Sequence, residues 1–199
     1  MTLPDRLTFI RVILTPVFFV VYMLPVLFPE QLAGSAVWAV PALWLIFIVS
    51  ELTDLFDGIA ARRLGLTSDF GKLFDPFADT LMQITCFFCF VIDGIFPAVL
   101  FLLVLYREFS ILFIRNLMLK KGVAMGARIG GKIKTVTHIA AAAIALLYAS
   151  LSRLGVFSGM QPFVKISAIA VFGVSVLFSV LSFMDYLTVY LNAGKTGPS

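Results

Sequence analysis

The sequence has few charged residues. Asp, Glu, Lys and Arg make up 13% of its 199 residues, whereas a soluble domain averages about 25%. Hydrophobic residues make up 61%, a composition typical of an integral membrane protein. It leaves no stretch polar enough for a separate soluble domain. The net charge of +4 is better understood by position than as a total, and we expect no nucleic-acid partner.

Cysteine is almost absent, since only Cys86 and Cys89 occur. Their C-x-x-C spacing lies inside an apolar run without the strand–helix–strand context of a redox site, so we expect two buried, packed thiols. No small-residue cleavage site follows the first apolar run, which therefore predicts a retained span rather than a signal peptide. Internal repeats and low-complexity segments are also lacking.

The long apolar runs predict an all-α integral membrane protein with six transmembrane helices, because one span needs roughly 20 apolar residues. Before the first span, Leu3, Leu7 and Ile10 share one helical face, which predicts a short interfacial amphipathic helix over residues 2–11. We expect one domain over residues 1–192 and a disordered tail over 193–199. The predicted spans are 12–28, 35–61, 72–92, 96–119, 131–151 and 163–191.

The basic residues predict the orientation of these spans. Nearly all of them fall on the side of the N-terminus, and only Arg153 and Lys165 fall on the other side. Because cytoplasmic loops carry the excess of Lys and Arg, both termini are expected in the cytoplasm. We expect the protein in the plasma (inner) membrane.

Four aspartates lie at the inner ends of the second and third predicted spans: Asp54, Asp57, Asp75 and Asp79. Each pair falls on one stripe of its helix, and the short connection lets the pairs face each other. Ionised carboxylates near a bilayer usually mark function, and four together repel one another unless a cation lies between them. Oxygen-only ligands favour hard cations. The cluster therefore predicts two divalent cations, Mg²⁺ or Mn²⁺, in a site suited to phosphoryl transfer.

Small residues accompany the acids: Gly58, Ala61 and Gly71. A missing side chain lets a bulky substrate approach the backbone closely. Small residues also let membrane helices pack, so this feature by itself leaves both explanations open.

The whole pattern, D-x2-D-G-x2-A-R-x8-G-x3-D-x3-D, resembles the signature of the CDP-alcohol phosphotransferases, and every fixed position is matched. The resemblance implies a six-helix, usually dimeric membrane enzyme in which an alcohol attacks the β-phosphorus of a CDP-linked substrate and releases CMP. It also implies metal binding by the four aspartates, with Asp79 as general base. The residues implied to bind the cytidine diphosphate are Asp54, Gly58, Ala61, Arg62, Gly71 and Asp75.

The acceptor alcohol is expected to be anionic, because cations gather after the aspartates. The candidates for acceptor binding are Arg107, Arg115, Lys132 and Lys134. Together with residues 3–11, these elements resemble bacterial phosphatidylglycerophosphate synthases, which implies CDP-diacylglycerol as donor and glycerol 3-phosphate as acceptor. Asp5 and His138 depart from the pattern usual in those enzymes.

Two alternatives accompany this hypothesis. The same chemistry can use another acceptor such as serine, inositol or inositol phosphate; a neutral acceptor is disfavoured by the cations, but inositol phosphate is anionic too. A cation transporter is the other alternative, although transporters usually place their acids near the bilayer midplane.

Glu108 is expected to neutralise a neighbouring arginine, and His138 to have a hydrogen-bonded packing role. Glu51 has two open roles, support of a metal ligand or pairing with a cation, and Asp185 has no assigned role.

Overall fold

The protein is an all-helical bundle. The computed structural model describes residues 3–32, 34–64, 69–120 and 129–193; within them, the backbone alone is described for residues 3–5, 57–64, 69–70, 72–73, 119–120, 129 and 192–193. No strand occurs in these ranges. The helices are α1 (Leu3–Leu27), α2 (Ala36–Leu64), α3 (Asp69–Ile92), α4 (Ala98–Lys120), α5 (Ile129–Leu154) and α6 (Gln161–Ala193).

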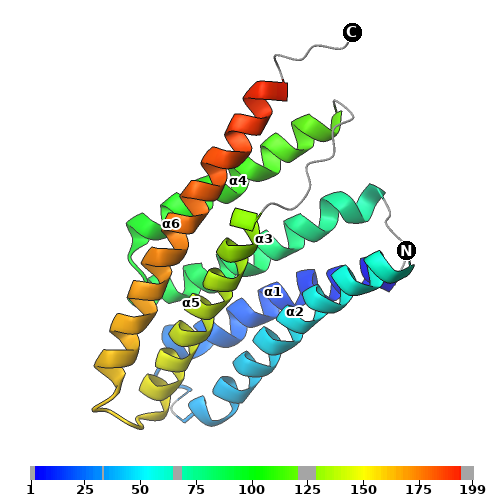
Figure 1. Cartoon of the computed structure of the whole chain (residues 1–199). Coiled ribbons are helices and arrows are strands. Elements are labelled where there is room, and N and C mark those ends of the chain that lie inside the picture. The colour runs from blue at the N-terminus through cyan, green and yellow to red at the C-terminus, as the bar shows by residue number, and fades with distance from the viewer. Residues whose placement is uncertain (1–2, 33, 65–68, 121–128, 194–199) are drawn as a thin grey trace.

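The six helices run up and down, so the start of α1 and the end of α6 lie at the same end of the bundle (Figure 1). Helix α1 packs against α2 and α3, while α6 packs against α5 and α4. Helix α3 also contacts α4 and α5, and α2 contacts α5. The middle helices α3 and α5 therefore join the two outer groups.

The surface is apolar and several polar groups lie inside, as expected for a protein surrounded by lipid. Phe113, Phe163 and Val37 are more than 60% exposed, whereas Ser175 and Ser179 are fully buried. Within the described residues, five helices are long and apolar enough to cross a membrane, which makes this a multi-pass membrane protein. Helix α4 is not among these five because it contains the charged residues Arg107, Glu108 and Arg115, and its role as the sixth span stays a prediction.

The predicted helices are confirmed with small shifts of their ends. A separate helix over residues 2–11 is not confirmed, because α1 is continuous from Leu3 to Leu27. The segment between the aspartate pairs is shorter than expected, since α2 continues to Leu64 and α3 already begins at Asp69. The predicted tail falls mostly on residues 194–199, which lie outside the described residues.

The end of the bundle away from the aspartates is closed by aromatic packing. The rings of Phe96 and Phe172 stack with centroids 3.9 Å apart, and Phe87 packs edge-on against Phe172 at 5.0 Å. At this end α5 stops at Gly155, whose φ of 65° is a left-handed conformation that glycine adopts without strain. The opposite end, where the aspartates lie, is less tightly filled and contains a cavity.

Candidate active site

A cavity of about 300 Å³ lies inside the bundle and is lined by residues of all six helices. It brings together most of the residues singled out from the sequence, although these span 80 positions of the chain, from Asp54 to Lys134. The predicted site residues that line it are Asp54, Asp75, Asp79, Arg107, Arg115, Lys132 and Lys134. These acidic and basic side chains thus share one cavity, with the acids on α2 and α3 and the bases on α4 and α5.

The acidic side of the cavity is organised by α1. The Arg11 guanidinium contacts Asp79 directly and lies 3.2 Å from Asp54 Oδ1, so one arginine joins carboxylates from two helices. One turn earlier, Thr8 Oγ1 donates a 2.6 Å hydrogen bond to Asp75 Oδ1. Arg11 is 1% exposed, and a buried arginine is stable only with anionic partners of this kind. Helix α1 therefore contacts three of the four motif aspartates.

The contacts of α1 with the aspartates were not predicted from the sequence. The sequence predicts a short interfacial helix over residues 2–11, because Leu3, Leu7 and Ile10 share a face. Ile10 does face outward, at 43% exposed, while Thr8 and Arg11 turn inward at 0% and 1%. In a membrane the apolar face is the exposed one, so the polar positions of this segment were the useful signal. Glu51, one turn before Asp54, also lines the cavity.

The rest of the predicted diphosphate site is only partly described. Asp57, Gly58, Ala61 and Arg62 belong to α2, but their side chains lie outside the described residues. Gly71 is buried near the start of α3. The roles expected for these five residues stay predictions.

The donor set of the acidic side fits a hard divalent cation. Asp54, Asp75 and Asp79 offer carboxylate oxygens without any sulfur or imidazole ligand, which is the set that Mg²⁺ or Mn²⁺ prefers. In the part of the chain described, no group of three or more His, Cys, Asp and Glu side chains is gathered closely enough to hold a metal. The carboxylates there lie around the positive charge of Arg11 instead, so they are already arranged about a cation.

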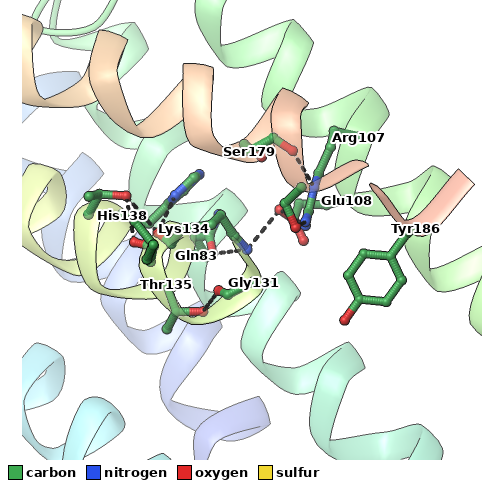
Figure 2. Close-up of polar contacts among 12 residues, drawn as sticks. Gln83, Arg107, Glu108, Gly131, Lys134, Thr135, His138, Ser179 and Tyr186 are labelled. Carbon is green, nitrogen blue, oxygen red and sulfur yellow. Dashed lines mark hydrogen bonds and ion pairs between the residues drawn. The ribbon is translucent and has the colours of Figure 1, made fainter. Parts of the chain in front are cut away.

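The basic side is built around Glu108, as Figure 2 shows. Glu108 Oε1 lies 2.8 Å from Arg107 Nη1 and 2.8 Å from Lys134 Nζ, so one carboxylate neutralises cations from α4 and α5. The predicted pairing of Glu108 with a neighbouring arginine is confirmed. Lys134 Nζ also donates to Gln83 Oε1 at 3.2 Å. These groups are almost completely buried, which fixes their positions.

Helix α6 contributes a buried polar stripe that the sequence analysis missed: Ser175, Ser179, Ser182 and Tyr186. Arg107 donates from Nε to the Ser179 carbonyl oxygen and from Nη2 to Ser182 Oγ, at 3.2 and 3.1 Å. Arg115 Nη2 donates to Tyr186 Oη at 3.2 Å. Their spacings of three and four residues place them on one helical face. This polar spacing was the signal in the sequence, within an otherwise hydrophobic segment.

The two predicted lysines lie in the first turns of α5, which begins at Ile129. On a continuous helix, side chains two positions apart point in widely different directions. Near the start of a helix, two such side chains can still reach the same cavity, and Lys132 and Lys134 both line it. Lys132 is exposed and Lys134 is buried, so the two differ in how freely they can move.

The remaining expectations concern packing. His138 Nδ1 lies 2.8 Å from the Lys134 carbonyl oxygen, and its ring stacks on Phe87 at 5.3 Å, which confirms a hydrogen-bonded packing role. Cys86 and Cys89 are free, buried thiols, as predicted. Asp185 lies on α6 and is not among the residues that line the cavity.

Comparison with known proteins gives the class. The model of the CDP-alcohol phosphatidyltransferase family matches residues 1–181, and the chain belongs to this family. It is therefore a membrane transferase, in agreement with its helical bundle and its aspartate-lined cavity.

The sequence is similar, over nearly its whole length, to proteins named as enzymes of this class. The chain is 35% identical to a CDP-diacylglycerol–glycerol-3-phosphate 3-phosphatidyltransferase of Treponema pallidum, covering 96% of this chain and 89% of the relative. It is 31% identical to a Bacillus subtilis protein of the same name, covering 98% and 97%. An Escherichia coli protein of that name is 29% identical, covering 94% and 93%.

Proposed function

We propose that the protein transfers the phosphatidyl group of CDP-diacylglycerol to glycerol 3-phosphate, which gives phosphatidylglycerol phosphate and CMP. One observation carries the proposal: a single cavity has an acidic side and a basic side. The acidic side suits a diphosphate accompanied by divalent cations, and the basic side suits the phosphate of the second substrate. The names of the similar proteins support this pair of substrates.

On the acidic side, Asp54, Asp57, Asp75 and Asp79 would hold two divalent cations, and Arg62 would balance phosphate charge. The bound cations would neutralise the diphosphate and make the acceptor hydroxyl more acidic. Thr8 and Arg11 would keep the described carboxylates turned toward the cavity, because each already contacts one or two of them. Gly58, Ala61 and Gly71 would let the nucleotide approach the backbone.

The reaction is a substitution at phosphorus. The oxygen of the acceptor hydroxyl forms a bond to the β-phosphorus of CDP-diacylglycerol, and the bond from that phosphorus to the CMP oxygen breaks. The hydroxyl proton passes to the carboxylate of Asp79, which lines the cavity and contacts Arg11. A carboxylate in this position is a suitable general base for the attack.

On the basic side, the described residues that line the cavity include four cationic side chains, Arg107, Arg115, Lys132 and Lys134, and one carboxylate, Glu108. The surplus positive charge favours an acceptor that carries a phosphate. It disfavours neutral acceptors such as serine or free inositol. Inositol phosphate satisfies the same charge requirement and is the alternative acceptor.

The setting of the reaction is also part of the proposal. The protein would act as a homodimer in the plasma (inner) membrane, with both termini and the mouth of the cavity at the cytoplasmic face. The asymmetry of Lys and Arg supports this orientation. Glycerol 3-phosphate and CMP are soluble, so the first would enter and the second would leave from that side.

The test is CMP release by the purified full-length protein with CDP-diacylglycerol and Mg²⁺ or Mn²⁺. Glycerol 3-phosphate, inositol phosphate, serine and inositol are supplied one at a time, with a metal-free sample as control. We expect CMP release with glycerol 3-phosphate and none without divalent cations. Release only with inositol phosphate would replace the acceptor, and no release with any alcohol would refute the transferase activity.

A further inference from the structure

Tyr186 on α6 is a cavity residue to which neither the sequence motifs nor the roles above assign a function. It is 2% exposed, yet its side chain lines the cavity. Figure 2 shows it extending from α6 toward the start of α5. A Cβ added to Gly131 would lie 3.8 Å from Tyr186 Oη. The hydroxyl is therefore close to the backbone of the segment that carries both lysines.

The Tyr186 hydroxyl has one of its two hydrogen-bonding capacities in use. Its oxygen accepts a hydrogen bond from Arg115 Nη2 at 3.2 Å, and the Arg115 guanidinium carbon lies 5.5 Å from the ring centroid. A tyrosine hydroxyl can also donate its hydrogen. No acceptor for that hydrogen lies among the residues that the structure describes. An oxygen of an anionic ligand beside Arg115 would supply one.

The two arginines of α4 differ in how much of their hydrogen-bonding capacity the protein uses. Arg107 is 7% exposed, and its Nε, Nη1 and Nη2 each have a protein partner. Arg115 donates only from Nη2 to the described residues, and its buried Nε has no partner among them. Arg107 is thus held in the bundle, whereas Arg115 and Tyr186 together keep donors available to a ligand.

We propose that Tyr186 is a binding residue for the phosphate of the acceptor: its hydroxyl donates to a phosphate oxygen that Arg115 also binds. This inference rests on the proposed function and adds to it a specificity residue outside the motif segments of α2 to α5. Because the contact is to the phosphate and not to the reacting hydroxyl, it contributes to acceptor binding more than to the chemical step.

Tyr186→Phe is the appropriate variant, since it removes the hydroxyl alone and keeps the ring beside Arg115. Losing a hydrogen bond to a charged group weakens binding by about tenfold or more. We therefore expect the KM for glycerol 3-phosphate to rise about tenfold with kcat within about twofold. The KM for CDP-diacylglycerol should not change. Tyr106→Phe is the matched control, because Tyr106 lies on α4, is 66% exposed and does not line the cavity.

The experiment measures CMP release by the full-length wild type and both variants, with each substrate varied in turn. Inorganic phosphate is added as a competing anion, and its inhibition constant should rise in Tyr186→Phe in parallel with the KM. An unchanged KM and inhibition constant would overturn the proposal, as would a fall in kcat with both KM values unchanged. Absence of wild-type activity with glycerol 3-phosphate would instead refute the proposed function, so the two failures are distinguishable.

Discussion

Two arginine–aspartate clusters lie at opposite ends of the bundle, and they differ in charge balance. At the aspartate end, Arg11 is shared by Asp54 and Asp79 beside the cavity. At the other end, Arg153 pairs with Asp93 at 3.5 Å and lies 4.0 Å from the ring of Tyr22. The second cluster has one cation for one carboxylate, while the first has more acid than base.

The difference indicates which cluster is structural and which is functional. Asp93 also accepts a 2.7 Å hydrogen bond from Tyr22, so the far cluster joins α1, α5 and the turn after α3 with its charges balanced. None of its three residues lines the cavity. Near the cavity, the excess acid requires another cation, and the excess base on α4 and α5 requires an anion. Unbalanced charge that faces an open space is a sign of ligand binding.

The largest expected effect separates these two clusters through a matched pair of substitutions. Asp79→Asn removes the proposed general base, so we expect kcat to fall about 10³-fold with the fold retained. Asp93→Asn changes the same chemical group at the other end and should leave kcat within about twofold, because it is far from the reacting atoms. CMP release and circular dichroism measure both. Near-normal turnover in Asp79→Asn would remove it as the base.

The next effect concerns Arg11. Arg11→Gln leaves Asp54 and Asp79 without their shared cation, so we expect a loss of activity of about 10²-fold from misplaced carboxylates. The protein should also depend more strongly on divalent cations for stability, because these cations can offset the repulsion that Arg11 no longer offsets. Thermal unfolding is measured with and without Mg²⁺, and the Mg²⁺-induced rise in Tm should exceed that of the wild type. Arg153→Gln is the control, and an equal rise in both variants would contradict the comparison.

A smaller effect is expected on the basic side. Glu108→Gln leaves Arg107 and Lys134 buried without the carboxylate that separates them, which costs about 3 kcal/mol of stability. The cations then lose their fixed positions, and the KM for glycerol 3-phosphate should rise while the KM for CDP-diacylglycerol stays the same. Chemical unfolding and substrate titration measure these quantities. A more stable variant with an unchanged acceptor KM would show that Glu108 does not position the cations.

The far cluster should respond in stability only. Asp93→Asn retains an oxygen for Tyr22 but loses the charge opposite Arg153; since Asp93 is 30% exposed, we expect a loss of about 1 kcal/mol. Thermal unfolding of the variant is compared with the wild type at two salt concentrations, and the difference should shrink at high salt. A change in either KM would show that this end is coupled to the cavity.

The acidic residues of the site could be predicted from the sequence because charged residues are rare in an apolar chain. Asp54, Asp75 and Asp79 stand out at the ends of spans, and their spacing places them on helical stripes that the bundle does bring together. The cations of α4 and α5 could be predicted for the same reason. The helix boundaries followed from the length of the apolar runs.

The partners of these residues could not be predicted, for a physical reason. Arg11 contacts aspartates 43 and 68 positions away. Its charge indicates that it turns inward, but nothing local in the sequence indicates which carboxylates it contacts. Ser182 and Tyr186 are ordinary in an apolar helix, where small or hydroxyl-bearing residues commonly serve packing. Their role follows only from the packing of α6 against α4 and α5, which is a tertiary property.

The smallest effect tests how firmly Arg107 is held by α6. Ser182→Ala removes one of its hydrogen bonds, from Nη2 to Oγ, while those to Ser179 and Glu108 remain. We expect a loss of about 1 kcal/mol in unfolding free energy and less than a twofold change in acceptor KM. Ser158→Ala, in an exposed turn, is the control, and both variants are compared by chemical unfolding and substrate titration. Ser182→Ala could instead raise the acceptor KM as strongly as Tyr186→Phe does. In that case loosening either arginine weakens the same phosphate contact, and the division between a positioned Arg107 and a ligand-binding Arg115 is wrong.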